Sequence, residues 1–186
     1  MLEINLNHFS LISRLFGNLF YREPTDPILA NVFGWLQQQG LSRIWPLDTD
    51  NETEQALASV QMAIDPAALA QEYDALFAGE EPAVPSRISA YGLNVEDFIA
   101  FRQERGMPAL EQADHFALLL LTASWLEDNV NSPTAQHELF ETWLLPCAAG
   151  FLTKVESRAI LPFYRSLSLL CREILAAMAD ELEGEE

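Results

Sequence analysis

The sequence predicts an all-α protein with a single helical unit of about eight to ten helices. Apolar residues recur at three- and four-residue steps along most of the chain, which is the spacing of one helix face. No segment alternates convincingly between apolar and polar residues, as strands do, and nothing repeats at a fixed period. Apolar residues make up 49% of the 186 residues, which is enough for a real core.

The first two expected helices follow from apolar stripes and one start signal. Residues 9–20 carry the first stripe. Asp26 and Pro27 then form a start signal, because Asp accepts hydrogen bonds from the free N–H groups of a helix and Pro suits its first turn. Gly40 is the expected stop of this second helix.

Similar signals recur in the middle of the chain. Asp65 and Pro66 predict another helix start, and Gly79 is the expected stop. Asn94 begins a capping-box pattern before the next apolar stripe, and Gly106 ends that stripe. Two helices are therefore expected here.

The C-terminal part contains further helices. Ser132 and Pro133 open one of them. The acidic tail from Asp180 has five acids and no base, a composition typical of disorder. The last helix follows Pro162 and is expected to place these residues on one face: Leu167, Leu170, Ile174, Leu175, Met178 and Leu182.

Two irregular stretches interrupt the helical pattern, at residues 79–94 and 105–114. The second lies before a strongly apolar helix. We therefore expect an N-terminal helical lobe over residues 1–106 and a C-terminal helical lobe with the acidic tail over residues 107–186.

The chain is strongly acidic. Ten Lys and Arg residues stand against 28 Asp and Glu residues, which gives a formal net charge of −18. Between Arg43 and Arg87 there are nine acids and no base. This charge argues against binding to nucleic acid or an anionic membrane surface and favours a basic partner.

The N-terminal segment and the apolar content bear on localisation. Glu3 lies where a secretory signal would carry a base, and no long apolar run follows it. The most apolar stretch without a charge, residues 116–126, has 11 residues and is too short to span a membrane. We expect a cytoplasmic protein without membrane insertion.

The sequence gives little support for catalysis. Cys147 and Cys171 have neither a disulfide-framework nor a zinc-finger spacing, so we expect two reduced, buried thiols. Phosphate-binding glycine loops and nucleophile elbows are missing from the sequence. His137, Glu138 and Glu141 are close enough along one helix to share a metal, but a surface His–Glu pair is commoner. We expect no cofactor, no metal and no enzymatic activity.

Two pairs of residues are candidates for binding. Asp114 and His115 lie where the second break meets the apolar helix, and either form a binding element or cap that helix through Asp114 with His115 in its first turn. Tyr73 and Phe77 are one helical turn apart and either line the mouth of a groove or pack in the core.

Three segments share their order and spacing with blocks of a known family. The segment YDALFAGEEPAVP is similar to a Tyr/Trp-x-x-Leu-Phe-x-Gly block followed by prolines. The segment QADHFALLLLTASWLEDN is similar to a Glu-Pro-Asp-His block, with Gln112 and Ala113 in place of Glu and Pro. FETWLLPCAAGFLTKVE and LPFYRSL match a Leu-x-Pro-x(4)-Phe helix and a Pro-Phe-Tyr-Arg segment. The chain thus resembles the TorD/DmsD/NarJ family of redox-enzyme maturation chaperones, most of all its YcdY branch.

The resemblance implies two helical lobes joined by a hinge near the Asp-His block. It also implies a cytoplasmic, system-specific chaperone that assists cofactor loading before folding or export. Its partner would be a client apo-metalloenzyme or molybdoenzyme, or that client's basic and apolar signal peptide, often a twin-arginine peptide. The chaperone itself would be a monomer or a dimer. The candidate peptide-binding residues are Tyr73, Phe77, Pro85, Tyr91, Asp114 and His115.

Two other functions remain open from the residues alone. One is an interaction scaffold whose groove is only a dimer interface. The other is a small metal-dependent helical enzyme that uses His137, Glu138 and Glu141.

Overall fold

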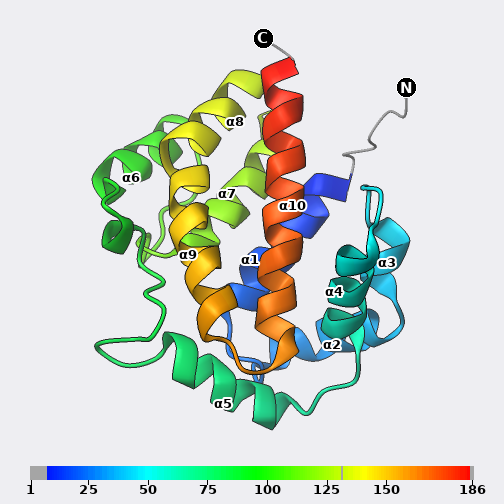
Figure 1. Ribbon diagram of the computed structural model, residues 1–186. Helices are drawn as coiled ribbons and strands as arrows, with labels where there is room; N and C mark the ends of the chain where they lie inside the picture. The colour runs from blue at the N-terminus through cyan, green and yellow to red at the C-terminus, as the bar shows by residue number, and fades with distance from the viewer. Residues whose placement is uncertain (1–7, 131, 185–186) are drawn as a thin grey trace.

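The computed structural model describes residues 8–130 and 132–184, and this part of the chain is helical, without strands (Figure 1). The predicted all-α class is therefore confirmed. In chain order the elements are α1 (Phe9–Tyr21), α2 (Pro27–Gln37), α3 (Gly40–Ile44), α4 (Asn51–Gln61), α5 (Pro66–Phe77), the 3-10 helix η2 (Ile88–Tyr91), α6 (Val95–Glu104), α7 (Phe116–Asn129), α8 (Pro133–Leu139), the π-helical turn η3 (Phe140–Leu144), α9 (Leu145–Arg158) and α10 (Pro162–Gly184).

Helix α1 packs against α7 at the centre of the molecule. Small residues on α1 allow this close approach, since a Cβ at Gly17 would lie 2.9 Å from the Leu121 side chain. Ser13 Oγ donates to the Leu120 carbonyl at 2.6 Å across the same contact. Helix α10 lies between α4 and α9 in Figure 1 and packs against both.

One continuous helical run extends through α8, η3 and α9. Its middle turn is π-helical, and the N–H of Leu145 donates to the Phe140 carbonyl five residues earlier. Pro146 follows directly and has no N–H to donate, so a widened turn accommodates it without breaking the helix. The same turn buries Trp143, whose Nε1 donates to the Asn94 carbonyl at 3.1 Å.

The predicted helix starts are confirmed. In each case a side-chain oxygen accepts a backbone N–H two or three residues later, and a proline follows the cap in three of the four. Gly79 and Gly106 follow helix ends with left-handed φ angles of 93° and 75°, which confirms both as stops. The four capping residues are Asp26, Asp65, Asn94 and Ser132.

The prediction that Gly40 stops the second helix is wrong. Helix α2 ends at Gln37, and the left-handed residue is Gln39, with a φ of 65°. Gly40 instead begins α3. A Cβ at Gly40 would lie 2.2 Å from the Trp35 ring, so the position needs glycine for packing rather than for its φ angle.

The expected disorder of the acidic tail is also wrong as far as Gly184, where α10 ends. Met178 and Leu182 are buried, so the apolar stripe continues beneath the acids and holds the helix against the core. The last two residues of the tail lie outside the described part. All six residues predicted for the buried face of this helix are buried.

The buried apolar residues form one cluster drawn from both sides of residue 106. The division into lobes 1–106 and 107–186 stays a prediction. Residues 1–7, on which the expectation about a signal depends in part, lie outside the described part of the chain. Among the described helices, none has the length and apolar content needed to cross a membrane.

Candidate functional site

The C-terminal half of α5 carries Tyr73 and Phe77 against an aromatic cluster. The Phe77 ring stacks on Phe151 of α9, with ring centres 5.8 Å apart, and meets Tyr164 of α10 edge-on at 5.6 Å. Phe151 in turn stacks on Phe116, the first residue of α7, at 4.4 Å. Tyr73 and Phe77 are half-buried, so each packs on the core and keeps part of its ring accessible.

Tyr21, at the end of α1, joins two of the predicted site residues. The Tyr73 hydroxyl donates to the Tyr21 carbonyl at 2.9 Å. The Tyr21 ring meets the His115 ring edge-on at 5.1 Å. Burial, with smaller contributions from the charges of Glu23 and Asp74, raises the pKa of Tyr73 to about 12, so its hydroxyl keeps its proton. No pattern in the sequence marks Tyr21 as a site residue, although it lies five residues before a confirmed helix start.

His115, not Asp114, caps α7. Its Nδ1 accepts from the N–H of Ala117 at 3.0 Å, and its backbone is extended, as the capping position requires. The interpretation with Asp114 as the cap and His115 in the first turn is therefore wrong. The reason is that Asp114 is engaged elsewhere.

Asp114 holds the segment between α5 and α6. Its Oδ1 accepts from the N–H of Ser89 at 3.0 Å, and its Oδ2 accepts from the Ser89 hydroxyl. Two residues later, the N–H of Phe116 donates to the Ser86 carbonyl at 2.7 Å. These bonds attach residues 86–89 to the start of α7, and any cation approaching Asp114 competes with Ser89.

Pro85 and Tyr91 lie in that same segment. The Tyr91 hydroxyl donates to the Pro85 carbonyl at 2.7 Å. The Tyr91 ring lies so close to α9 that a Cβ at Gly150 would be 2.5 Å from it, and Lys154 Nζ lies 5.0 Å from the ring centre. Burial raises the pKa of Tyr91 as well.

The six predicted residues therefore form two groups. Tyr73, Phe77 and His115 gather around Tyr21 and the aromatic cluster. The second group consists of Pro85, Tyr91 and Asp114. Pro85 and Tyr91 lie in the segment 78–94 on the side of α9, and Asp114 is hydrogen-bonded to that segment through Ser89.

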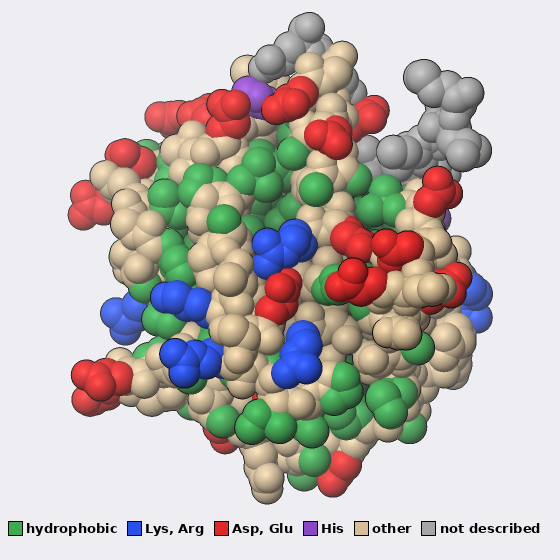
Figure 2. All heavy atoms as spheres, in the orientation of Figure 1, with side chains coloured by type: hydrophobic (Ala, Val, Ile, Leu, Met, Phe, Trp, Pro, Cys, Tyr) green, Lys and Arg blue, Asp and Glu red, His purple; other side chains and the backbone are tan. Residues whose placement is uncertain are grey.

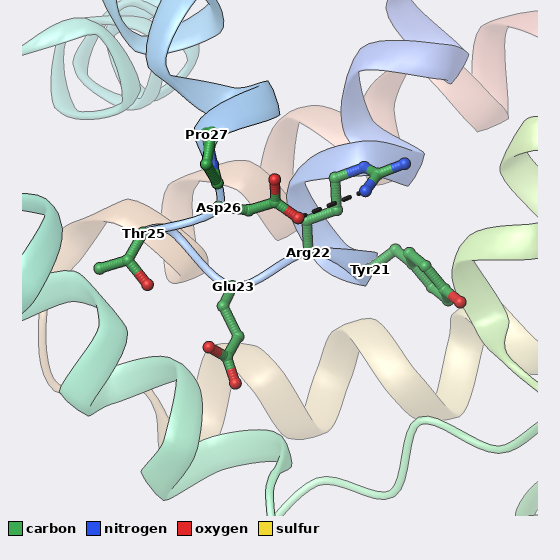
Figure 3. Close-up of a pocket in the computed structure, with 6 residues that line it drawn as sticks. All are labelled: Tyr21, Arg22, Glu23, Thr25, Asp26 and Pro27. Carbon is green, nitrogen blue, oxygen red and sulfur yellow. Dashed lines mark hydrogen bonds and ion pairs between the residues drawn. The ribbon is translucent and has the colours of Figure 1, made fainter.

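A pocket of about 450 Å³ lies at the turn between α1 and α2, next to the first group. It is lined by Tyr21, Arg22, Glu23, Thr25, Asp26 and Pro27 (Figure 3).

Charge is unevenly distributed over the surface. Figure 2 shows carboxylates gathered over α4 and near the C-terminal end of α10, and basic side chains over α9 and the beginning of α10. The basic residues of these two helices are Lys154, Arg158, Arg165 and Arg172, and they are exposed.

The three candidate metal ligands form ion pairs, and both cysteines are buried. His137 Nε2 lies 3.3 Å from the Glu141 carboxylate, and Glu138 pairs with Arg105 at 3.1 Å. A search of the described residues finds no group of three or more side chains suited to a metal ion. Both cysteines are buried without a disulfide, as predicted, and burial raises the pKa of the Cys147 thiol to about 12.

The His115 cap makes stability depend on pH. Burial lowers the pKa of His115 from 6.5 to about 4, although the charge of Asp114 opposes this shift. Because the unfolded chain takes up this proton first, the free energy of unfolding falls as pH decreases from 6.5 to 4, by up to about 3 kcal/mol from this group. Protonation of Nδ1 also removes the acceptor of the cap.

We expect His115→Asn to lose this contribution to the pH dependence, since Asn caps helices without titrating. Urea denaturation of both proteins between pH 7 and pH 4 measures the difference. Parallel curves for wild type and variant over that range would show that His115 does not have this role.

Comparison with known proteins gives matches over the whole chain. No family model matches it. A Haemophilus influenzae protein described only as uncharacterized is 65% identical over 185 residues, which is 100% of both chains. The chaperone protein YcdY of Escherichia coli K12 is 40% identical over 183 residues, or 96% of this chain and 97% of that protein. The Tat proofreading chaperone DmsD of Salmonella paratyphi A is 30% identical over 190 residues, or 94% of this chain and 90% of that protein.

These relatives agree with the resemblance carried by the three sequence blocks. Two of the three are named as chaperones, which confirms the prediction that the chain is not an enzyme. The chain therefore belongs to the TorD/DmsD family of chaperones, and within it to the YcdY branch.

Proposed function

We propose that the protein is a cytoplasmic chaperone that binds the signal peptide or the apo form of one client metalloenzyme or molybdoenzyme. It holds that client until its cofactor is loaded, before folding or export. The bound segment is basic and apolar, and it lies along Tyr73, Phe77 and His115.

One observation carries this proposal. Three half-buried rings lie near the pocket that the exposed Tyr21 lines: His115 meets the Tyr21 ring edge-on, the Tyr73 hydroxyl donates to the Tyr21 carbonyl, and Phe77 packs against Tyr73. Aromatic faces of this kind accept apolar side chains and also stack on guanidinium groups.

The charge of the chain supports a basic client segment. Helix α5 belongs to the stretch between Arg43 and Arg87 that has nine acids and no base. Such a field accelerates encounter with a basic segment and makes binding sensitive to salt. The binding step needs no bond to be broken, in agreement with a chaperone.

Asp114 contributes to this proposal by holding residues 86–89 beside the site. Asp114→Ala removes both acceptors of Ser89, so we expect the segment to loosen and client retention to fall about tenfold. The measurement is recovery of the client from a cytosolic extract of the source organism at low salt, followed by a high-salt wash and mass spectrometry. We expect wild type to recover one metal-requiring enzyme with a basic, apolar N-terminus.

Two matched variants distinguish the effect of losing the hydrogen bonds to Ser89 from the effect of losing a negative charge. Asp114→Asn keeps an acceptor for the Ser89 N–H and loses the charge, whereas Asp48→Ala removes one exposed charge elsewhere. If positioning matters, Asp114→Asn retains more client than Asp114→Ala, and Asp48→Ala behaves as wild type. Recovery of no salt-sensitive client by the wild type would contradict the proposed function.

A further inference from the structure

The turn between α9 and α10 presents a large apolar side chain to solvent. Ile160 is 86% exposed, whereas the other exposed large apolar side chains among the described residues reach at most 58%. Its two neighbours are packed, since Ala159 is buried and Leu161 is half-buried. Ile160 therefore projects from a packed turn, and covering it with apolar groups of a partner would be favourable.

Hydrogen bonds hold this turn in one conformation. The N–H groups of Ile160 and Leu161 donate to the Glu72 carboxylate of α5 at 3.1 and 3.0 Å. One residue earlier, the Ala159 carbonyl accepts from the Arg165 guanidinium. Because the backbone is already fixed, a partner that covers Ile160 does not have to order the turn, which lowers the entropic cost of binding.

The helices on both sides of the turn are basic, although the chain as a whole is acidic. Figure 2 shows basic side chains over α9 and the beginning of α10. Residues 142–172 contain four bases and a single acid, Glu156, which pairs with Arg172 at 2.9 Å. The other three bases are exposed and form no ion pair with a carboxylate of the described part of the chain: Lys154, Arg158 and Arg165.

These unpaired bases are unusual for this protein. Acids outnumber bases by 28 to 10, and three arginines elsewhere, Arg14, Arg22 and Arg105, each pair with a carboxylate. The surface around Ile160 is thus a place from which carboxylates of the chain itself are excluded. Positive charge that the protein leaves uncompensated can pair with carboxylates of another molecule.

We propose that the α9–α10 turn docks an acidic, partly apolar segment of another protein, with Ile160 as the apolar anchor and Arg158 as a charged contact beside it. A small anion would use the bases alone, whereas the projecting isoleucine needs a partner with apolar groups. The formal net charge of −18 opposes approach to an anionic membrane. The segment bound here has the opposite charge to the proposed client segment, so this proposal does not depend on the proposed function.

Two labelled synthetic peptides test the site by fluorescence anisotropy. One consists of leucines and glutamates spaced as on an amphipathic helix, and the other has glutamine at every glutamate position. We expect wild type to bind the acidic peptide about tenfold more tightly at low salt, with a smaller difference at high salt. Ile160→Ala and Arg158→Glu are each expected to weaken binding of the acidic peptide about tenfold. Because both side chains are exposed, both variants are expected to fold, which circular dichroism checks.

The matched controls are Ile28→Ala, at an isoleucine of α2 that is 58% exposed, and Arg43→Glu, at an exposed arginine of α3. Both are expected to bind the acidic peptide as wild type does. Equal losses in the variants and their controls would overturn the docking site, as would equal affinity of wild type for the two peptides or binding of neither. Vesicles that contain phosphatidylglycerol provide the last comparison, because binding to them that Ile160→Ala weakens would assign the turn to a membrane surface instead.

Discussion

Replacing Phe151 with alanine is expected to lower the free energy of unfolding by about 3–5 kcal/mol, the largest effect of any single change considered for this protein. Phe151 is fully buried. Its ring stacks on Phe116 and Phe77 and meets Phe20 edge-on at 5.3 Å. Four helices thus meet through one side chain, and alanine leaves a cavity that their backbones cannot fill without moving.

Urea denaturation, with the midpoint and the slope fitted separately, measures this loss. Phe151→Leu is the matched variant, because it keeps most of the buried volume and loses only the ring contacts, so a smaller loss is expected. A Phe151→Ala protein that loses less than about 1 kcal/mol would show that the four helices do not depend on this ring for their packing.

The same change connects stability to the proposed site. Phe77 rests on the Phe151 ring, and Phe77 lies one helical turn after Tyr73. In the folded fraction of Phe151→Ala, both side chains lose their support. Client recovery is therefore expected to fall further than the folded fraction does.

The local part of this fold could be predicted from the sequence because helix starts are decided by neighbouring residues. At Asp26 and Asp65 the capping carboxylate accepts an N–H only two residues away, so the pattern alone is sufficient. Apolar periodicity likewise predicted the buried face of α10. Leu182 continues that apolar stripe past Asp180, and its burial keeps the tail helical although the acidic composition there is typical of disorder.

The site could be predicted only in part because contacts distant in the sequence decide it. Asp114 and His115 are both able to cap a helix, and the choice falls on His115 because Ser89, 25 residues earlier, occupies both oxygens of Asp114. Tyr21 belongs to the site because its carbonyl accepts a hydrogen bond from the hydroxyl of Tyr73, 52 residues later in the chain. No local pattern marks that pairing, since a tyrosine at a helix end is usually unremarkable.

Replacing Glu72 with alanine is expected to lower the free energy of unfolding by about 2–4 kcal/mol. Glu72 is 8% exposed, and its carboxylate accepts from the N–H of Ile160 at 3.1 Å and from that of Leu161 at 3.0 Å. These donors lie in the turn between α9 and α10, just before α10 begins at Pro162. Alanine leaves both N–H groups without this acceptor.

Glu72→Gln keeps one carbonyl oxygen and is expected to cost about half as much, whereas Glu80→Ala, in an exposed position after α5, should stay within about 0.5 kcal/mol of wild type. Denaturation in urea again supplies the measurement. Equal stability of Glu72→Ala and Glu80→Ala would show that the two backbone bonds contribute nothing to the fold.

Glu72 also explains how α5 can present Tyr73 without being deeply buried itself. Between Pro66 and Phe77 the helix buries only three side chains, so its apolar contact with the core is small for its length. The two hydrogen bonds from the α9–α10 turn fix its position next to Tyr73, where packing alone is weakest. Because the neighbouring side chain is a proposed binding residue, Glu72→Ala is expected to weaken client binding in the folded protein. A change of equal cost in the buried face of the C-terminal half of α10, such as at Leu175, is expected to leave binding unchanged. That difference distinguishes a positioning role of Glu72 from a general loss of stability.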